Sequence, residues 1–198
     1  VRSIRDWVKS KGLLAAINAS MYQQDGLTST GYMRSGRQTN NDRIVRRYGA
    51  FFVCGPRQAG LPRAAVLDRE NDDWEKLLPL YDTVVQNFRL MGRQGQQLWP
   101  EDGPKHAISA VAEDLNGRIL FLHCSEPVSV HDFVETLNAH PDLNLNSAMY
   151  AEGGSEASLM INMPGCLILW NGATMASTMF SPTGRERLLP NILGVIRR

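Results

Sequence analysis

The spacing of apolar residues along the chain predicts two short amphipathic helices. Apolar positions recur at i, i+3 and i+4 within residues 3–11 and again within residues 129–139, which places them on one helix face. Each segment opens with a serine followed three residues later by an aspartate, which resembles an N-terminal capping box. We therefore predict helices over both segments, the first ended by Gly12 and the second by Pro141.

Short apolar runs between turn residues predict a larger number of strands. The run over residues 13–19 is nearly unbroken, which favours a strand buried on both faces. Two hairpins are indicated, because Asn116-Gly117 and Pro164-Gly165 each separate two apolar runs. The hairpin strands are expected over residues 107–112 with 118–123 and 158–162 with 167–170. Further strands are expected over 32–34, 50–53, 64–67, 84–91, 148–151 and 191–196, and a short helix over 72–80.

One helix-then-strand unit occurs twice in the chain. Residues 2–8 correspond to residues 128–134, and the strand ending over 17–22 corresponds to that over 145–150. If the two strands pair in space, the loops after them open on one pole of the molecule. A hairpin precedes the second helix but not the first, so we expect an upstream strand pair before Val1 in the intact fold. The prediction is a single α/β domain over residues 1–198, with a mixed sheet and two pseudo-repeated halves.

Composition narrows the classes of partner. Of 198 residues, 43% are hydrophobic and 21% are charged, which is ordinary for a globular protein. The formal net charge of +1 indicates neither a nucleic acid nor an anionic membrane as partner. No apolar run approaches the roughly 20 residues that span a bilayer, so we predict no transmembrane segment.

The cysteines and histidines do not suggest a metal centre. Cys54, Cys124 and Cys166 are scattered without a Cys-x-x-Cys pair, which disfavours structural zinc. They are either small buried hydrophobic residues or one disulfide with a free thiol, and an export compartment would permit the disulfide. Because no His and carboxylate set has metal-ligand spacing, we predict that the chain uses no metal and no cofactor.

The loop after the second central strand is the first candidate site. Glu152 is followed there by Gly153, Gly154 and Ser155, so a carboxylate stands beside flexible backbone. Glu152 is either a functional carboxylate, a solvated turn residue or an acid paired with an arginine. The two glycines form either an ordinary tight turn or a nest of N–H groups that holds an anion. Their place after a buried strand is what favours function.

Other polar residues stand at strand ends or on strand faces. Asn18 ends the first apolar strand, where its buried amide must hydrogen-bond either the opposite loop or a bound ligand. Gln86 or Arg89 reaches an anionic ligand, or both belong to the outer face of a strand. Glu126 precedes Pro127 at a strand-to-helix junction and is the second carboxylate candidate.

Two motifs resemble the phosphodiester glycosidase family. That family usually carries a strand ending in Asn-Leu-Asp-Gly-Gly-Gly-Ser and an earlier one ending in Asn-Gly-Gly-Phe-Phe. The corresponding segments here are Ala148-Met149-Tyr150-Ala151-Glu152-Gly153-Gly154-Ser155 and Asn18-Ala19-Ser20-Met21-Tyr22. Glu152 therefore replaces the family aspartate, Tyr150 its asparagine and Ser155 its third glycine. An arginine expected before the strand at residue 107 is absent, and Lys105 and His106 are nearest.

The resemblance implies an exported hydrolase that cleaves a sugar-1-phosphodiester, on envelope or extracellular glycans, through a transition state with oxocarbenium character. Its implied ligand is a carbohydrate or sugar phosphate. Glu152 is then the catalytic carboxylate, and His106 either replaces the missing arginine as a phosphate donor or is a structural histidine. We expect Glu152 and Glu126 to be catalytic and the remaining candidates to bind substrate: Asn18, Gln86, Arg89, His106, Gly153, Gly154 and Ser155. The alternatives are a non-catalytic carbohydrate-binding module and a structural partner of a polysaccharide assembly.

Overall fold

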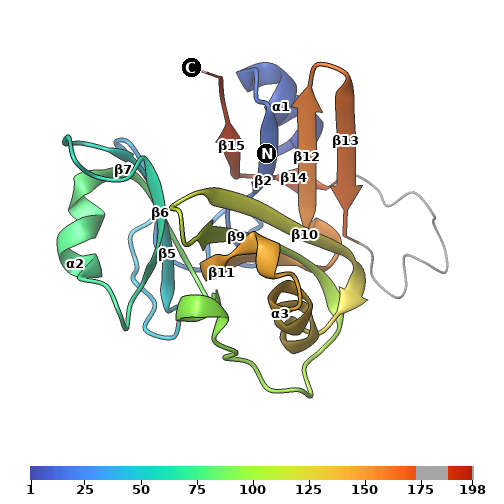
Figure 1. Cartoon of the computed structure of the whole chain (residues 1–198). Helices are drawn as coiled ribbons and strands as arrows, with labels where there is room; N and C mark the ends of the chain where they lie inside the picture. The colour runs from blue at the N-terminus through green and yellow to red at the C-terminus, as the bar shows by residue number, and fades with distance from the viewer. Residues whose placement is uncertain (173–186, 198) are drawn as a thin grey trace.

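The strands of the computed structural model divide among three larger sheets and one two-stranded ladder (Figure 1). The structure describes residues 1–172 and 187–197. The first sheet has the order β13 (Cys166–Asn171), β12 (Ser158–Met163), β2 (Ala15–Asn18) and β15 (Ile192–Val195). The second has the order β10 (Ile119–Val128), β9 (His106–Asp114), β11 (Leu145–Gly153) and β8 (Arg89–Met91).

The third sheet is built mostly from the middle of the chain. Its order is β4 (Gln38–Asn41), β3 (Met33–Ser35), β7 (Tyr81–Asn87), β5 (Ala50–Pro56) and β6 (Ala64–Asp68). The ladder joins β1 (Arg2–Ser3) to β14 (Leu188–Leu189). Every strand pairing within the described ranges is antiparallel.

A helix packs against each large sheet. Helix α1 (Ile4–Lys11) lies on the first sheet, α3 (Val130–Asn138) on the second, and α2 (Trp74–Leu77), with the 3-10 turn Leu78–Leu80, on the third. Ser3 and Ser129 cap α1 and α3 by accepting the N–H of the aspartate three residues on. Gly12 ends α1 in the left-handed region at φ 61°.

The three sheets share a central hydrophobic cluster. Ile17 of the first sheet, Met149 of the second and Phe52 of the third belong to it, and all are buried. Each helix closes a separate cluster on the opposite face of its sheet. Burial on both faces explains why the central strands are nearly continuous apolar runs, since neither set of alternating side chains faces water.

The structure confirms the mixed α and β class, both capped helices and both hairpins. The expectation of one mixed sheet is wrong, because the strands form several antiparallel sheets and the two repeat strands, β2 and β11, lie in different ones. The predicted 72–80 helix is a single α-turn continued as a 3-10 turn, and β4 was not foreseen. The upstream strand pair and the single-domain assignment of residues 1–198 stay predictions.

The segment predicted as one strand over residues 84–91 passes from the third sheet to the second. It is divided into β7 and β8 at Phe88. The Asn87 side chain accepts the Phe88 N–H at 2.8 Å and donates to the Ala151 carbonyl at 3.1 Å. These hydrogen bonds satisfy backbone groups where the ladder changes partner, and they bring Phe88 beside the end of β11.

The loops after the two repeat strands do meet, as expected. The Asn18 amide at the end of β2 donates to the Glu156 carbonyl at 2.8 Å and accepts the Ser158 N–H at 2.7 Å. Those partners follow β11 directly. The repeat strands thus belong to different sheets but deliver their following loops to one place.

Candidate active site

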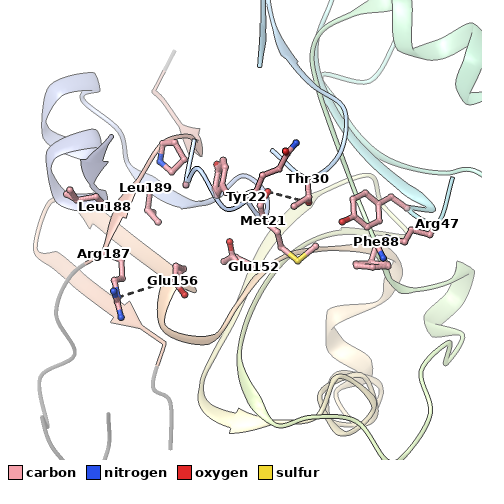
Figure 2. Close-up of a pocket in the computed structure, with 14 residues that line it drawn as sticks. Met21, Tyr22, Thr30, Arg47, Phe88, Glu152, Glu156, Arg187, Leu188 and Leu189 are labelled. Carbon is pink, nitrogen blue, oxygen red and sulfur yellow. Dashed lines mark hydrogen bonds and ion pairs between the residues drawn. The ribbon is translucent and has the colours of Figure 1, made fainter. Parts of the chain in front are cut away.

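A hollow of about 870 Å³ opens where these loops meet (Figure 2). Its walls come from the loop after β2, the segment before β5, the junction of β7 and β8, the end of β11 and the segment around β14. Figure 2 shows Glu152 in the middle of the lining, with Glu156 and Arg187 toward one side and Phe88 and Arg47 toward the other. Two carboxyl groups and two guanidinium groups therefore face one space.

Glu152 is a partly buried carboxyl group with a strongly shifted proton affinity. Burial raises the pKa of Glu152 to about 8, a hydrogen bond from the Gly153 N–H opposes the rise, and the charge of Glu156 adds to it. That hydrogen bond reaches Oε1 of Glu152 at 2.9 Å. Glu152 is therefore mostly protonated at neutral pH and can donate a proton to a bound molecule.

Glu156 is the second carboxyl group of the hollow. Its Oε2 accepts a hydrogen bond from the Ser155 hydroxyl at 2.8 Å, and its Oε1 lies 3.9 Å from Nε of Arg187. The Asn18 amide holds the backbone of the same residue. The Glu156 carboxylate is thus fixed by its neighbour and stands beside a cation.

Aromatic side chains line the floor on the Arg47 side. Tyr48 and Phe88 meet edge to face with ring centroids 4.5 Å apart. The Arg47 guanidinium lies over both rings, 5.3 Å and 5.7 Å from their centroids. Tyr22 closes another wall and donates its hydroxyl to the Asn191 carbonyl at 3.2 Å. Burial raises the pKa of Tyr22, so its phenol stays protonated and serves as a donor and an apolar surface.

The side chains of His106 and Tyr150 pack against the end of β11 beside Glu152. Nε2 of His106 lies 3.0 Å from the Tyr150 hydroxyl, and burial lowers the pKa of His106. Both side chains contact the position where Gly153 would carry a Cβ. Gly153 is therefore required by the close approach of this pair, and its N–H is held toward Glu152.

The family model for phosphodiester glycosidases matches residues 11–196. The chain belongs to this family. A solved structure of the zebrafish N-acetylglucosamine-1-phosphodiester alpha-N-acetylglucosaminidase catalytic domain, auto-inhibited by its pro-peptide, has a TM-score of 0.65 and 16% identity. That match covers 100% of this chain and 67% of the zebrafish chain.

A hypothetical protein from Synechocystis has a TM-score of 0.52 and 13% identity, and the match covers 87% of this chain and 51% of that one. At such identities these likenesses show a shared fold. No curated protein matches the sequence significantly.

Several residues that the sequence nominated have structural tasks in this family member. Asn18 is fully buried and both ends of its amide bond the opposite loop, which was one of its two expected roles. Gln86 is also fully buried, and it bonds backbone groups of Tyr32, Val45 and Tyr48. Neither side chain lines the hollow.

Two other candidates point away from Glu152. Arg89 forms ion pairs with Asp68 and Glu70 and lines a neighbouring hollow instead. Glu126 is exposed on β10, an edge strand that β9 separates from β11. The sequence placed Glu126 at a strand-to-helix junction, but a junction on an edge strand faces solvent and not the space above Glu152.

The Gly-Gly turn does not present a free anion nest. The Gly153 N–H is already bonded to Glu152, and Gly154 adopts the left-handed region at φ 72° to turn the chain. Ser155 bonds Glu156. These three residues shape and position the two carboxyl groups rather than lining the hollow themselves.

Sequence reasoning missed five important lining residues: Tyr22, Arg47, Phe88, Glu156 and Arg187. Tyr22 is the last residue of the first repeat motif and Glu156 directly follows the second, so the two motifs with one further residue contain both of them. The basic segment around Arg47 was visible, but no local pattern places it beside Glu152.

The structure also bears on the other expectations. In residues 1–172 and 187–197, no three His, Cys, Asp or Glu side chains come together as metal ligands, and no helix is long and apolar enough to cross a membrane. Cys54, Cys124 and Cys166 are all free thiols and partly buried, so the disulfide alternative is not realised. The absence of a metal or cofactor from the reaction stays a prediction.

Proposed function

We propose that this chain is a hydrolase that cleaves sugar-1-phosphodiesters in the hollow around Glu152. The observation that carries the proposal is a carboxyl group with a pKa of about 8 in a hollow that also holds a second carboxyl group and two arginines. Two carboxyl groups facing one binding space are typical of glycoside hydrolysis. Family membership supports the same reaction class.

The residues divide the reaction between them. Glu152 donates its proton to the phosphate oxygen that leaves the anomeric carbon, as its raised pKa favours. Glu156 stabilises the positive charge at the anomeric carbon and takes the proton of the water that adds there. The bond between the anomeric carbon and oxygen breaks, and the sugar is released with a hydroxyl group. This gives Glu152 an acid role, where the sequence indicated a charged carboxylate.

The remaining lining supplies binding. Arg47 and Arg187 attract the phosphate, because guanidinium groups match phosphate oxygens in charge and geometry. The rings of Phe88 and Tyr22, both partly exposed, offer flat apolar surface for a sugar ring. The zebrafish relative is an N-acetylglucosamine-1-phosphodiester alpha-N-acetylglucosaminidase, which makes N-acetylglucosamine-1-phosphate esters the first substrates to test. An exported protein acting on envelope or extracellular glycans would meet such esters.

The direct test is release of free N-acetylglucosamine from its methyl phosphodiester. We expect Glu152→Gln to lower kcat by about 100-fold or more with little change in binding, because the amide keeps the shape but cannot donate a proton. Glu101→Gln is the matched control, since Glu101 is exposed and outside the hollow. Equal turnover by the wild type and Glu152→Gln would refute the acid role of Glu152.

A non-catalytic carbohydrate-binding module is the second candidate. It is favoured by the altered motif, because the Gly153 N–H that an anion nest needs is taken by Glu152. Such a module would bind the methyl phosphodiester in calorimetry and release no sugar over long incubation. Membership of a polysaccharide assembly would instead give a stable protein complex without glycan binding.

A further inference from the structure

We propose that an arginine-rich hollow beside the active site binds a second phosphate, so that the substrate is a chain of sugar-phosphate repeats. This adjoining hollow, of about 490 Å³, is lined by Arg46, Arg47, Arg69 and Arg89, with Trp99 and a single carboxylate, Glu70. It shares Arg47 and Phe88 with the hollow around Glu152. The inference rests on the proposed function, because it concerns the part of the same substrate beyond the bond that breaks.

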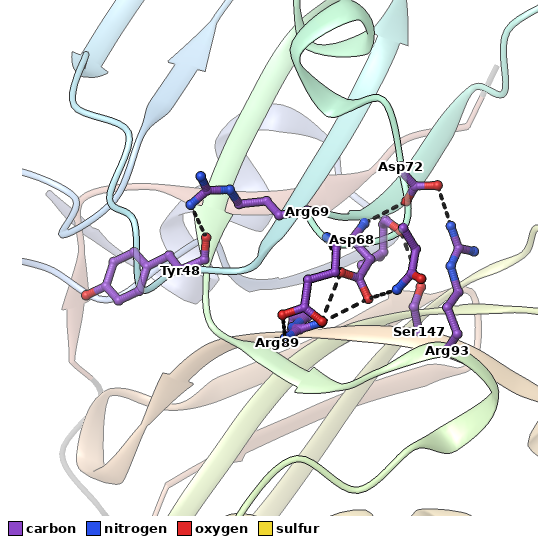
Figure 3. A network of polar contacts seen from close by, with 10 residues as sticks. Tyr48, Asp68, Arg69, Asp72, Arg89, Arg93 and Ser147 are labelled. Carbon is purple, nitrogen blue, oxygen red and sulfur yellow. Dashed lines mark hydrogen bonds and ion pairs between the residues drawn. The ribbon is translucent and has the colours of Figure 1, made fainter.

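Two of the four arginines, Arg69 and Arg89, already have polar partners within the protein. Arg89 pairs with Asp68 at 3.2 Å and with Glu70 (Figure 3). Arg69 donates to three backbone carbonyls and lies over Trp74, 4.8 Å from its centroid. These contacts hold the guanidinium groups in place and neutralise Arg89.

Arg46 and Arg47 remain available to an anion. No carboxylate among the described residues lies within ion-pairing distance of either side chain. Both are exposed, and Arg47 lies over the Tyr48 and Phe88 rings. Arg46 lines only the adjoining hollow, so its guanidinium group can bind the second phosphate with several N–H donors, while Arg47, which lines both hollows, binds the phosphate near Glu152.

Hydrogen bonds from the side chains of Gln86 and Arg69 hold the backbone around Arg46 and Arg47. The buried Gln86 amide accepts the Val45 N–H at 2.9 Å and donates to the carbonyls of Val45 and Tyr48. From the other side, Arg69 bonds the carbonyls of Val45, Arg46 and Tyr48, and Figure 3 shows it reaching toward Tyr48. The segment therefore needs little ordering when a ligand binds, which favours affinity.

Aromatic residues connect the two hollows. Phe88 and Trp99 meet edge to face with centroids 5.8 Å apart, and Trp99 is fixed by a 3.0 Å hydrogen bond to the Arg89 carbonyl. A sugar ring placed over this surface would separate one phosphate near Glu152 from another near Arg46. A repeat of sugar and phosphate has this alternation, whereas a sugar nucleotide carries its two phosphates side by side.

Three synthetic substrates test the inference. All carry the same terminal N-acetylglucosamine-1-phosphate and differ in the alcohol that esterifies it. In the first the alcohol is methanol, and in the second it is the 6-hydroxyl of a methyl glycoside. In the third it is the 6-hydroxyl of a sugar that bears a second methyl phosphodiester. The last two differ only by the second phosphate. We expect kcat/KM to be about tenfold or more higher with the second phosphate, and this advantage to shrink as salt increases.

Arg46→Gln should remove that advantage and leave turnover of the methyl ester unchanged, because Arg46 lines only the adjoining hollow. Arg43→Gln is the matched control, an exposed arginine on the same segment that lines neither hollow, and it should keep the advantage. Equal kcat/KM with and without the second phosphate would overturn the inference while leaving the proposed function intact. So would equal effects of the two arginine variants, or a preference for a uridine diphosphate sugar.

If no substrate is turned over, the proposed function fails and binding decides the subsite. Calorimetry with the two-phosphate compound should then show tighter binding than with its one-phosphate analogue, and only Arg46→Gln should abolish the difference. Equal affinities in that experiment would overturn the subsite as well.

Discussion

The hydroxyl of Tyr150 lies 3.0 Å from Nε2 of His106, and this pair packs against Gly153, whose N–H is bonded to Glu152. The catalytic candidate is thus supported by a chain of contacts that starts two residues before it. Burial raises the pKa of Tyr150, so the phenol keeps its proton for the hydrogen bond to His106. The relationship explains why β11 ends in a glycine at position 153, where a Cβ would overlap the Tyr150 hydroxyl.

Gly153→Ala should therefore destabilise the protein. The added methyl group would overlap the Tyr150 hydroxyl and crowd His106, which costs about 2 kcal/mol of the free energy of unfolding. Adding Tyr150→Phe should recover part of that loss, because it removes the overlapping oxygen. Urea unfolding measures both effects. Gly103→Ala is the control, with the nearest atom 3.7 Å away, and strictly additive losses in the double variant would contradict the contact.

Stability should fall as the pH rises through the titration of Glu152. The pKa of this carboxyl group increases from its ordinary value of 4.5 to about 8 in the folded chain, so the folded state binds more protons than the unfolded state between these values. The free energy of unfolding therefore decreases from about pH 4.5 to 8, by on the order of 3 kcal/mol from this group.

Glu152→Gln should flatten that dependence, since the amide does not titrate. Urea unfolding of the wild type, Glu152→Gln and Glu101→Gln at pH 5 and pH 9 measures it. Parallel behaviour of Glu152→Gln and the wild type would show that the Glu152 carboxyl has an ordinary pKa. Hydrolysis should likewise decline above about pH 8, where the proton donor is lost.

Asn18→Ala should lower both the stability of the protein and the rate of hydrolysis. The substitution leaves the Ser158 N–H without its buried partner and removes one of the two hydrogen bonds to the Glu156 carbonyl, at a cost of about 2 kcal/mol. Because the backbone of Glu156 is then held less firmly, kcat should fall as well. Thermal unfolding and hydrolysis rates measure the two effects. A variant with unchanged stability and only a raised KM would instead indicate that Asn18 contacts the sugar.

Glu126→Gln should leave hydrolysis within about twofold of the wild type, since exposed substitutions away from a site have small effects. Glu126 is exposed on β10 and does not line the hollow. Steady-state rates on the methyl phosphodiester measure this. A loss of activity comparable to that of Glu152→Gln would restore the role that the sequence indicated for Glu126.

The sequence correctly predicted those helices and hairpins whose ends are set by a few neighbouring residues. The capping serines at positions 3 and 129 and the Asn116-Gly117 turn act over four or five residues, so the two helices and the hairpin appear as expected. The break at Phe88 was missed, because a single asparagine, Asn87, within the run from Val84 to Met91 is too weak a local signal to end a strand. It depends on the Asn87 amide finding Ala151, a partner 64 residues away.

The sequence by itself determined that a carboxylate beside two glycines follows the apolar run of the second repeat, and that the first repeat ends at a matching place. Only the tertiary structure decided what those residues do. Burial set the pKa of Glu152, the buried amides of Asn18 and Gln86 were used to hold loops, and Arg47 and Arg187 were brought to Glu152 from distant segments. The physical reason is that solvation and charge at a site depend on every segment packed around it, whereas capping and turn preferences act between neighbours in the chain.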